Sequence, residues 1–237
     1  MRTFPEGLTI VIPAYNEEGS LRAVAEEVRA LAAKALESFE IVIVDDGSRD
    51  GTRRVADALA REHPQVRVLA HARNSGSGVA IKTGVAAARY DKVMYIPADG
   101  QFRVSEIGAY LKAADRGDIV IGARLSRSDY SPFRLLSSKV FIVLVNFLFD
   151  QRFRDVNWVH LWRREIFERV RPISDGVFLL EEILVRARAA GYRVVEIDSV
   201  YQPRRGGAAK GSKLSTIART LVEMGRFWIS GRFGGKT

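Results

Sequence analysis

The sequence contains no cysteine, which excludes disulfide bonds, thiolate metal sites and cysteine nucleophiles. It contains three histidines, His63, His71 and His160, and their spacing does not match that of a histidine-ligated zinc site. We therefore expect any bound metal ion to have oxygen ligands. No apolar run reaches the roughly 18 residues that a membrane span needs, and the few polar residues before Leu8 do not resemble a signal peptide. These absences predict a cytosolic or peripheral protein.

The length and composition fit one α/β domain, because 237 residues with 47% hydrophobic side chains can fill a sizeable core. The net charge of +9 is uneven, since residues 203–237 hold eight Lys or Arg and one Glu, which is +7 of the total. Such a basic segment suits an anionic membrane, a phosphorylated substrate or nucleic acid, or is a solvated tail. We do not expect nucleic acid, because the segment lacks interleaved aromatic residues and any recognised motif.

Apolar runs and helical periodicities alternate along the first half of the chain, which predicts a layered, mostly parallel α/β sheet. The expected strands are short runs rich in β-branched residues: 8–12, 40–44, 66–70, 94–96, 119–121 and 194–197. The expected helices cover about 17–35, the neighbourhoods of Val55 and Val79, 104–114, 135–149, 178–190 and 214–233. We expect a single domain over 1–237, with its core at about 8–200 and a basic amphipathic segment at 203–237.

The apolar stretch 135–149 differs from the other expected helices, because basic residues flank it at both ends. It is too short to span a bilayer, so it is either a buried core helix or one that lies in a membrane interface. The flanking cations favour the interface.

Polar turns follow several of the expected strands, and in an open α/β sheet ligands bind at the carboxyl ends of strands. After the strand at 94–96, Asp99 and Gln101 present a carboxylate and an amide, which are oxygen ligands suited to a hard cation such as Mg²⁺. The plainer interpretation of this turn is a solvated surface loop. Asp45 and Asp46 end the strand at 40–44, where a buried carboxylate is costly unless a partner hydrogen-bonds it.

The glycine loop at 74–78, NSGSG, is a weak phosphate-binding signal. It lacks the third glycine of the dinucleotide fingerprint, and Lys82 lacks the context of a P-loop lysine. We therefore exclude a nicotinamide dehydrogenase and a P-loop nucleotidase.

Several strings in this order resemble the family 2 glycosyltransferases of the GT-A fold, and among them the polyprenyl-phosphate sugar transferases of the dolichol-phosphate mannosyltransferase type. The strings extend from about residue 9 to residue 213: IPAYNEE, VDDGSRDGT, ADGQ, GAR, FLLEEILVRARAAGY and a basic segment with GSK. The resemblance implies a GT-A nucleotide-sugar-binding fold with a central sheet flanked by helices.

The resemblance also implies roles for individual residues. Those that would line the nucleotide pocket are Pro13, Ala14, Tyr15, Glu17, Asp45, Asp46 and Asp99. Asp99 and Gln101 would hold Mg²⁺ or Mn²⁺. The residues that would contact the acceptor or donor phosphates are Arg124, Arg204, Lys210, Ser212 and Lys213. Glu182 would position the sugar, so the catalytic set would be Asp99, Arg124 and Glu182.

One position departs from the family pattern. The acidic triplet of the family reads Asp-x-Asp, and Pro97 stands at its first position here. We therefore expect weaker metal binding, with water or Gln101 completing the coordination. The Lys or Leu that is frequent in the glycine loop of the family is replaced by Ser77.

The activity implied is an inverting, metal-dependent transfer of a hexose from GDP-mannose or a UDP-sugar to a dolichyl or undecaprenyl phosphate. The enzyme would act as a peripheral protein on the cytoplasmic, inner face of a membrane; a membrane-protein partner or a homo-oligomer is left open. Two alternatives stay open as well. One is transfer to a glycan or soluble hydroxyl, which would need Glu181 or Glu182 as a base. The other is a non-catalytic nucleotide-sugar binding module, motivated by Pro97.

Overall fold

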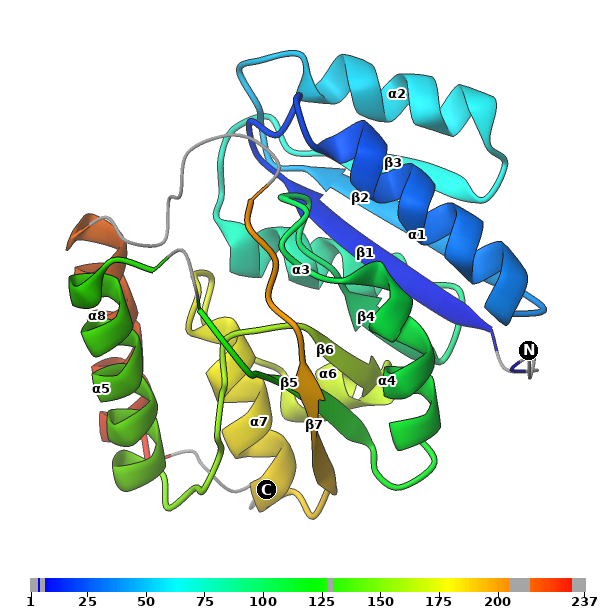
Figure 1. The fold of residues 1–237 in the computed structure, drawn as a ribbon. Coiled ribbons are helices and arrows are strands. Elements are labelled where there is room, and N and C mark those ends of the chain that lie inside the picture. Colours follow the sequence, from blue (N-terminus) through cyan, green and yellow to red (C-terminus); the bar gives the residue numbers. More distant parts are fainter. Residues whose placement is uncertain (1–3, 5–6, 128–129, 205–213, 232–237) are drawn as a thin grey trace.

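The computed structural model describes residues 4, 7–127, 130–204 and 214–231 of the chain. These residues build one seven-stranded sheet with the order β3-β2-β1-β4-β6-β5-β7, flanked by helices (Figure 1). The strands are β1 (Leu8–Ala14), β2 (Phe39–Asp45), β3 (Val66–Ala70), β4 (Lys92–Tyr95), β5 (Ile119–Arg124), β6 (His160–Arg163) and β7 (Val194–Ser199). The expected α/β fold class is therefore confirmed.

Helices cover both faces of the sheet because alternate residues of its strands are apolar on both sides. On β1, Ile10 and Ile12 join one core cluster and Val11 joins the other. The first cluster includes residues of α1 (Leu21–Ala35), α2 (Thr52–Glu62) and α4 (Ile107–Ala113). The second includes residues of α3 (Ser77–Ala86), α5 (Pro132–Leu148), α6 (Glu165–Val170), α7 (Leu179–Ala189) and α8 (Leu214–Ile229).

Strand β6 was not expected from the sequence, and it makes the sheet mixed. It pairs antiparallel with both β4 and β5, whereas β1 pairs in parallel with β2 and β4. Its four residues, HLWR, are too few to show a period, and they enter a central position where three of the four are buried. The short helix α6 that follows was also not expected.

Two element boundaries differ from the expected ones near the carboxyl end of β1. Pro13 does not end β1, which continues to Ala14 in register with Asp45 of β2. On the other side, β4 pairs with β1 only as far as Val11, so the missing N–H of Pro13 interrupts no ladder there. Helix α1 begins at Leu21 and not at Glu17, because residues 17–20 form a turn closed by Glu17.

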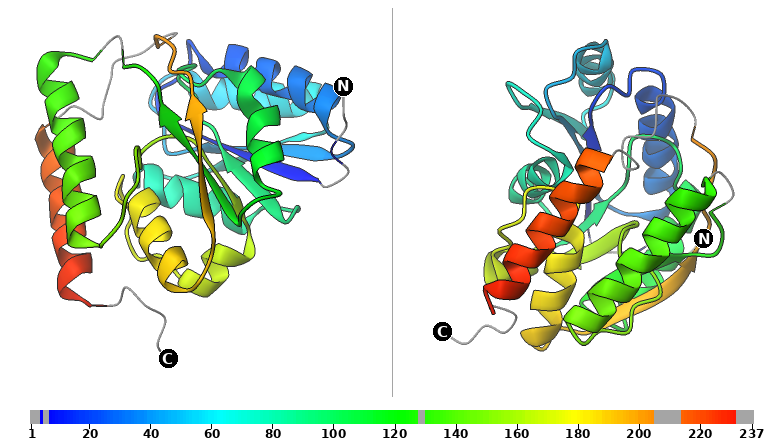
Figure 2. Two further views of the ribbon diagram at one scale, coloured as in Figure 1. Left: turned by 60° about the horizontal axis from the view of Figure 1, so that its bottom comes forward. Right: turned by 90° about the vertical axis from the view of Figure 1, so that its left-hand side faces the viewer.

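Helices α5 and α8 lie side by side at one end of the sheet (Figure 2), and Phe149 after α5 packs 5.3 Å from Phe227 of α8 between ring centroids. Apolar side chains are frequent among the described residues of both helices, but over these residues neither helix has the length and hydropathy to cross a bilayer. The two helices and the carboxyl ends of the central strands enclose the space described next.

Candidate active site

A cavity of about 640 Å³ lies between the carboxyl ends of the central strands and the helix pair α5 and α8. Its polar wall comes from the turns after β1, β4 and β5, and its apolar wall comes from α5, α7 and α8. The residues that line it include Glu17, Ser77, Tyr95, Pro97, Asp99, Gln101, Arg124, Tyr130, Phe133, Arg134, Leu136, Val140, Leu144, Asp155, Trp158, Leu180, Arg204, Ile217 and Leu221. The sequence-predicted residues Glu17, Asp99, Gln101, Arg124 and Arg204 thus meet in one place.

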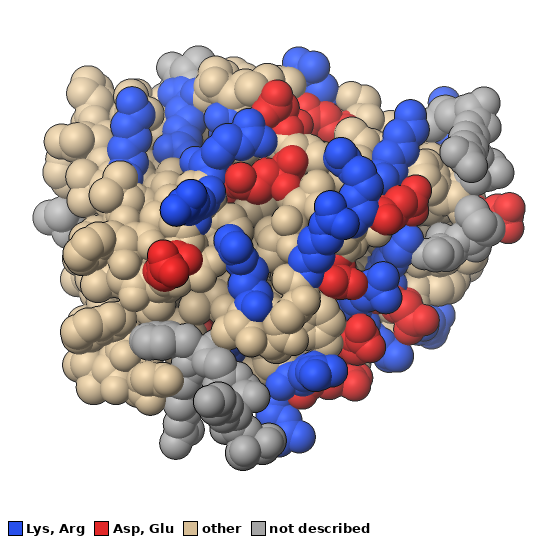
Figure 3. All heavy atoms as spheres, turned by 90° about the horizontal axis from the view of Figure 1, so that it is seen from below, with Lys and Arg blue, Asp and Glu red and all other residues tan. Residues whose placement is uncertain are grey.

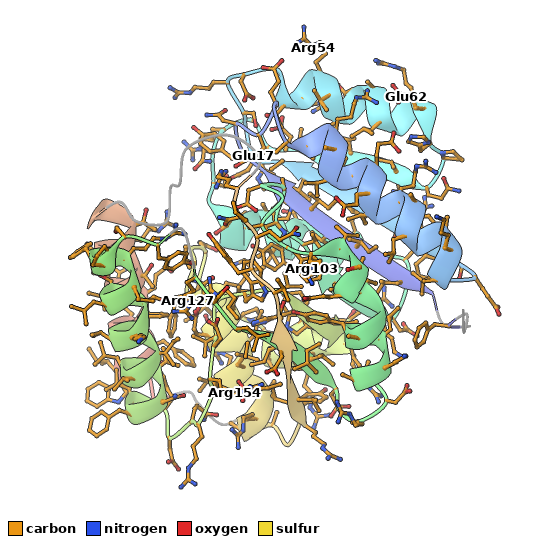
Figure 4. The ribbon with its side chains drawn as sticks, viewed as in Figure 1. Glu17, Arg54, Glu62, Arg103, Arg127 and Arg154 are labelled. Atoms are coloured by element: carbon orange, nitrogen blue, oxygen red, sulfur yellow. The ribbon has the colours of Figure 1, made fainter. Side chains whose placement is uncertain are left out.

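Glu17, Asp99 and Arg204 form an acidic cluster at one end of this cavity. Arg204 contacts Glu17 through Nη2, and its Nη1 lies 3.2 Å from Oδ2 of Asp99. Glu17 follows β1 (Figure 4), and its other oxygen accepts a hydrogen bond of 3.0 Å from Ser20. Two carboxylates therefore share one guanidinium in a partly buried position.

The oxygen atoms of this end fit a hard divalent cation. Burial raises the pKa of Asp99. It outweighs the hydrogen bond from the Gln101 backbone N–H and the charge of Arg204, which both lower that pKa. Gln101 directs its amide nitrogen to the Tyr201 hydroxyl, and its backbone N–H donates to Asp99 at 3.0 Å. Carboxylate and amide oxygens are ligands that Mg²⁺ and Mn²⁺ accept, and a guanidinium already supplies positive charge between Glu17 and Asp99. The donor set therefore fits the expected ion, whose binding stays a prediction.

Arg124, Arg127, Arg134 and Asp155 form a basic cluster at the other end, around the ring of Tyr130. The guanidinium carbons of the three arginines lie 5.9, 5.8 and 3.7 Å from the centroid of that ring, in the order of their numbers. Arg124 binds both oxygens of Asp155, at 2.7 and 2.8 Å, and Arg127 binds one of them at 2.9 Å. Three cations therefore gather around this ring with one anion, which binds two of them.

The charges of the basic cluster are strongly coupled. Burial alone would raise the pKa of Asp155, but the hydrogen bonds and charges of Arg124 and Arg127 outweigh it and lower the pKa to about 2. Arg124 stays protonated, because the same contact raises its pKa against the effect of burial. Arg124 was expected at a phosphate, and it does line the cavity, but its main partner in this structure is Asp155.

Sequence reasoning noted Arg127 and Arg134 only as flanking charges and did not identify Tyr130, Asp155 or Trp158. The basic cluster joins the end of β5, the loop after it and the first turn of α5, which follow one another in sequence, to Asp155 in the loop before β6, 31 residues after Arg124. The sequence signal that could have indicated this cluster is the pair Arg127 and Arg134, which lie shortly after GAR on either side of Tyr130.

The expected nucleotide residues Pro13, Ala14, Tyr15 and Asp45 lie together at the carboxyl ends of β1 and β2. Pro13 pairs in register with Val44, and Ala14 pairs with Asp45. Asp45 is buried, and its Oδ1 accepts from the Ser48 backbone at 3.1 Å. Contact of these four residues with a nucleotide stays a prediction, whereas their position at one sheet edge beside Glu17 agrees with it.

Asp46 has a different set of partners. It accepts hydrogen bonds of 2.9 Å from the backbone N–H groups of Ser75 and Gly76, and His71 Nδ1 lies 2.7 Å from its Oδ1. Gly76 has φ +104°, so the loop needs glycine there. Asp46 thus anchors the glycine loop, and its expected contact with the base or ribose is not needed to explain its burial.

The structure does not bring Glu182 to the cavity. Glu182 is fully buried, and it accepts from the backbone N–H groups of Ile173 and Ser174 and pairs with Arg186 at 2.6 Å. Its carboxylate anchors the loop before α7, and its expected role at the sugar stays a prediction. Neighbouring Glu181 is also buried, and its oxygens have no hydrogen-bond partner among the described residues, so burial raises its pKa well above the ordinary value. The expected phosphate contacts Lys210, Ser212 and Lys213 lie outside the described residues.

Two curated proteins are similar to this chain in sequence. Undecaprenyl-phosphate 4-deoxy-4-formamido-L-arabinose transferase of Aeromonas hydrophila subsp. hydrophila is 30% identical over 210 residues, which are 86% of this chain and 62% of that protein. The chain therefore spans less than two thirds of that relative. Polyprenol monophosphomannose synthase of Mycolicibacterium smegmatis is 29% identical over 236 residues, covering 94% of this chain and 87% of that protein.

A solved structure has the same fold. Glucosyl-3-phosphoglycerate synthase from Mycobacterium tuberculosis, in complex with Mn²⁺, UDP and phosphoglyceric acid, superposes with a TM-score of 0.74 at 15% identity, covering 94% of this chain and 78% of that chain. At this identity the likeness shows the fold alone, which is the GT-A fold implied by the sequence motifs. The model of the family described as "Glycosyl transferase family 2" matches residues 9–173. Because that match covers most of the chain, the protein belongs to glycosyl transferase family 2.

Proposed function

We propose that the protein transfers a hexose from a nucleoside-diphosphate sugar to a polyprenyl phosphate, with inversion at the sugar. The observation that carries the proposal is the layout of one cavity, which has an acidic cluster at one end, a basic cluster at the other and an apolar wall between two helices. This order matches a donor with its cation, a phosphate acceptor and the hydrocarbon chain of that acceptor. The names of the relatives support the same acceptor class.

The donor would lie along the carboxyl ends of β1, β2 and β4. Pro13, Ala14, Tyr15 and Asp45 would hold the nucleoside, and Asp99 and Gln101, beside Glu17, would hold Mg²⁺ or Mn²⁺ near the diphosphate. When bound, this ion supplies positive charge to the leaving diphosphate. The chain adds Arg204, whose guanidinium is close enough to Asp99 to reach the same diphosphate.

The acceptor phosphate would lie in the basic cluster, where Arg134 and Arg124 line the cavity. A phosphate oxygen attacks the anomeric carbon, the bond from that carbon to the diphosphate oxygen breaks, and the nucleoside diphosphate leaves with the electron pair. A phosphate monoester has a second pKa near 6, so the nucleophile is already ionised near neutral pH. The reaction therefore needs no general base.

Attachment to a membrane surface is part of this proposal. On α5, the exposed apolar side chains recur every three or four residues and form one stripe: Phe133, Leu136, Val140, Val143 and Phe147. A second stripe on α8 comprises Leu221, Val222, Trp228 and Ile229. The edge of the molecule formed by these helices is largely uncharged in Figure 3. The inner walls of both helices line the cavity, so a lipid acceptor could enter directly from the bilayer.

Cations around the apolar stripes favour an anionic bilayer as the partner. Lys139 of α5 and Arg219 and Arg226 of α8 are exposed beside these stripes, and each cation near an anionic surface adds about 1 kcal/mol. The side of the membrane, expected above to be the inner face, stays a prediction.

A transfer assay tests the proposed function. The purified protein is given Mn²⁺, a panel of labelled UDP- and GDP-sugars, and either vesicles with polyprenyl phosphate or soluble sugars and alcohols. We expect label in a butanol-extractable lipid that mild acid releases as free sugar. Label in a hydroxyl acceptor would replace the acceptor class, and donor binding without turnover on either acceptor would favour a binding module.

A further inference from the structure

Arg204 occupies the place where positive charge is needed between Glu17 and Asp99. The exposed fractions of the three side chains are 16%, 9% and 15%, so water screens their interactions only in part. Two carboxylates held this close together repel each other unless a cation lies between them. In this structure the guanidinium of Arg204 provides that cation.

A backbone bridge brings the segment of Arg204 beside the turn of Asp99. Phe102 and Tyr201 form an isolated antiparallel bridge, and the N–H of Gln202 donates to the carbonyl of Gln101 at 2.8 Å. Asp99 lies in the turn just before this bridge and Arg204 lies just after it, so their side chains can meet at 3.2 Å. The contact therefore joins the segment after β7 to the turn after β4.

The guanidinium and a divalent cation would use the same oxygens. Binding the ion beside Arg204 would bring two positive groups together around two carboxylates, because Pro97 supplies no third one. A nucleoside diphosphate changes this balance, since its phosphates offer Arg204 another anionic partner. The ion can then take the oxygens of Asp99 while the guanidinium turns to the diphosphate.

We propose that Arg204 is a resident counter-ion that competes with the divalent metal and thereby couples metal binding to donor binding. This inference rests on the proposed use of a nucleoside-diphosphate donor with a metal at Asp99. In the absence of donor, Arg204 keeps the metal affinity low. With donor bound, metal and nucleotide each tighten the binding of the other, because linkage is reciprocal.

A purely structural ion pair makes the opposite prediction for a substitution. If Arg204 only held the two segments together, Arg204→Gln would loosen the site and weaken metal binding. If Arg204 competes with the metal, Arg204→Gln frees the two carboxylates and strengthens metal binding in the absence of nucleotide. The sign of the change therefore separates the two roles.

The experiment measures Mn²⁺ binding by calorimetry and by the electron paramagnetic resonance signal of free Mn²⁺, with and without UDP or GDP. We expect nucleotide to tighten Mn²⁺ binding to the unchanged protein by about ten- to a hundredfold, a usual range of coupling. Arg204→Gln should bind Mn²⁺ alone about tenfold more tightly and lose most of the coupling. Arg204→Lys, which keeps the charge without the two-pronged contact, should fall between them.

Two controls complete the design. Arg53→Gln removes an arginine that pairs with Asp57 at 2.8 Å on the exposed face of α2, so it should leave Mn²⁺ binding unchanged. In thermal unfolding, Mn²⁺ alone should raise the melting temperature of Arg204→Gln more than that of the unchanged protein. This second readout also shows whether the variant is folded.

The outcomes distinguish failure of this inference from failure of the proposed function. If both proteins bind Mn²⁺ and nucleotide but Arg204→Gln binds Mn²⁺ no more tightly than the unchanged protein, the inference is wrong and the proposed function stands. If the unchanged protein binds neither Mn²⁺ nor nucleotide, both are wrong. Tighter Mn²⁺ binding by Arg204→Gln with reduced coupling supports the inference.

Discussion

The two ion clusters of the cavity are opposite in composition. In the acidic cluster two carboxylates, Glu17 and Asp99, share the guanidinium of Arg204. In the basic cluster three guanidiniums lie around the ring of Tyr130, and two of them bind the single carboxylate of Asp155. The acidic cluster therefore carries a net negative charge and the basic cluster carries a net positive charge. One cavity can thus receive a cation with a diphosphate at one end and a phosphate at the other.

The clusters also differ in how firmly their carboxylates are held. Asp155 is almost completely buried, and its pKa is lowered to about 2 by Arg124 and Arg127 against the effect of burial. The pKa of Asp99 is instead raised by burial, so its ionised form is less well stabilised. The basic cluster is therefore a rigid part of the fold, whereas the acidic cluster has charge left to satisfy when a ligand binds.

The largest effect is expected from a substitution in the acidic cluster. Asp99→Asn should lower transfer about a thousandfold, as for removal of a group that stabilises charge in the transition state, while the melting temperature changes little. Gln101→Ala should cost less, because water can replace a neutral ligand. Turnover at fixed donor and Mn²⁺ concentration measures both variants. Turnover like that of the unchanged protein in Asp99→Asn, or full activity in excess EDTA, would show that this turn holds no essential metal.

A substitution in the basic cluster should lower the free energy of unfolding. Asp155→Asn removes the carboxylate between Arg124 and Arg127, and breaking a buried pair costs about 3 to 5 kcal/mol. Urea unfolding at pH 7 measures that loss. An Arg134→Gln variant, whose guanidinium is not bound to Asp155 among the contacts described here, should unfold close to the unchanged protein. Equal stability of Asp155→Asn and the unchanged protein would contradict the assignment of a rigid basic cluster.

The pH dependence of the same variant sharpens this prediction. The folded pKa of Asp155 is lowered, so its stabilising effect is complete above the ordinary pKa near 4 and is lost as pH falls towards about 2. The difference in unfolding free energy between the unchanged protein and Asp155→Asn should therefore shrink below pH 4. A constant difference from pH 7 to pH 2 would count against the lowered pKa.

The apolar stripes should have a smaller effect, on membrane binding. Replacing Phe147 and Ile229, whose exposed fractions are 82% and 79%, by serine removes apolar surface worth about 1.5 to 3 kcal/mol per side chain when fully buried. Sedimentation with phosphatidylglycerol vesicles should show weaker binding for the double variant, and binding of the unchanged protein should fall with salt. Leu125→Ser, at 64% exposure outside both helices, is the matched control. Equal loss in the control variant would exclude α5 and α8 as the membrane surface.

The smallest expected effect concerns Glu181, a buried carboxyl group without a guanidinium partner among the described residues. Burial raises its pKa, so the folded state keeps the proton and stability falls as pH rises above the ordinary value near 4.5. Glu181→Gln should therefore be more stable than the unchanged protein by about 1 kcal/mol at pH 8, the order of a buried polar group without a full partner. The gain should vanish near pH 4.5, as measured by urea unfolding at both pH values. A destabilised variant at pH 8 would mean that the ionised carboxylate is needed.

The sequence predicted the parts of the site that are encoded locally. Asp99 and Gln101 lie in one turn after a short strand, and Pro13 to Glu17 follow a compact apolar run, so their place at the sheet edge could be read from neighbouring residues. The layered α/β class followed in the same way from alternating strands and helices, whereas the GT-A fold was implied by the resemblance of the motifs to family 2 glycosyltransferases. Strand β6 could not be predicted, because its four residues take their conformation from β4 and β5 on either side.

Contacts between distant segments were the part that sequence reasoning missed. The pairing of Arg204 with Asp99 joins two segments 105 residues apart that meet at the bridge between Phe102 and Tyr201, and nothing in the sequence of either segment indicates it. Asp46 and Glu182 were expected to serve ligands. In the structure their carboxylates accept hydrogen bonds from the backbone N–H groups of loops that fold back onto them. Any residue can supply a backbone N–H group, so the sequences of those loops do not reveal these contacts.

The most direct test of the central claim measures the binding of two ligands to two variants. For Asp99→Asn and Arg134→Gln, calorimetry measures the binding of nucleoside diphosphate in the presence of Mn²⁺. Flotation measures the binding of each variant to neutral vesicles that contain polyprenyl phosphate. The division of the cavity predicts that Asp99→Asn loses metal-dependent nucleotide binding and keeps the polyprenyl phosphate, whereas Arg134→Gln shows the reverse. Loss of both ligands in either folded variant, or retention of both in each, would contradict the assignment of donor and acceptor to the two clusters.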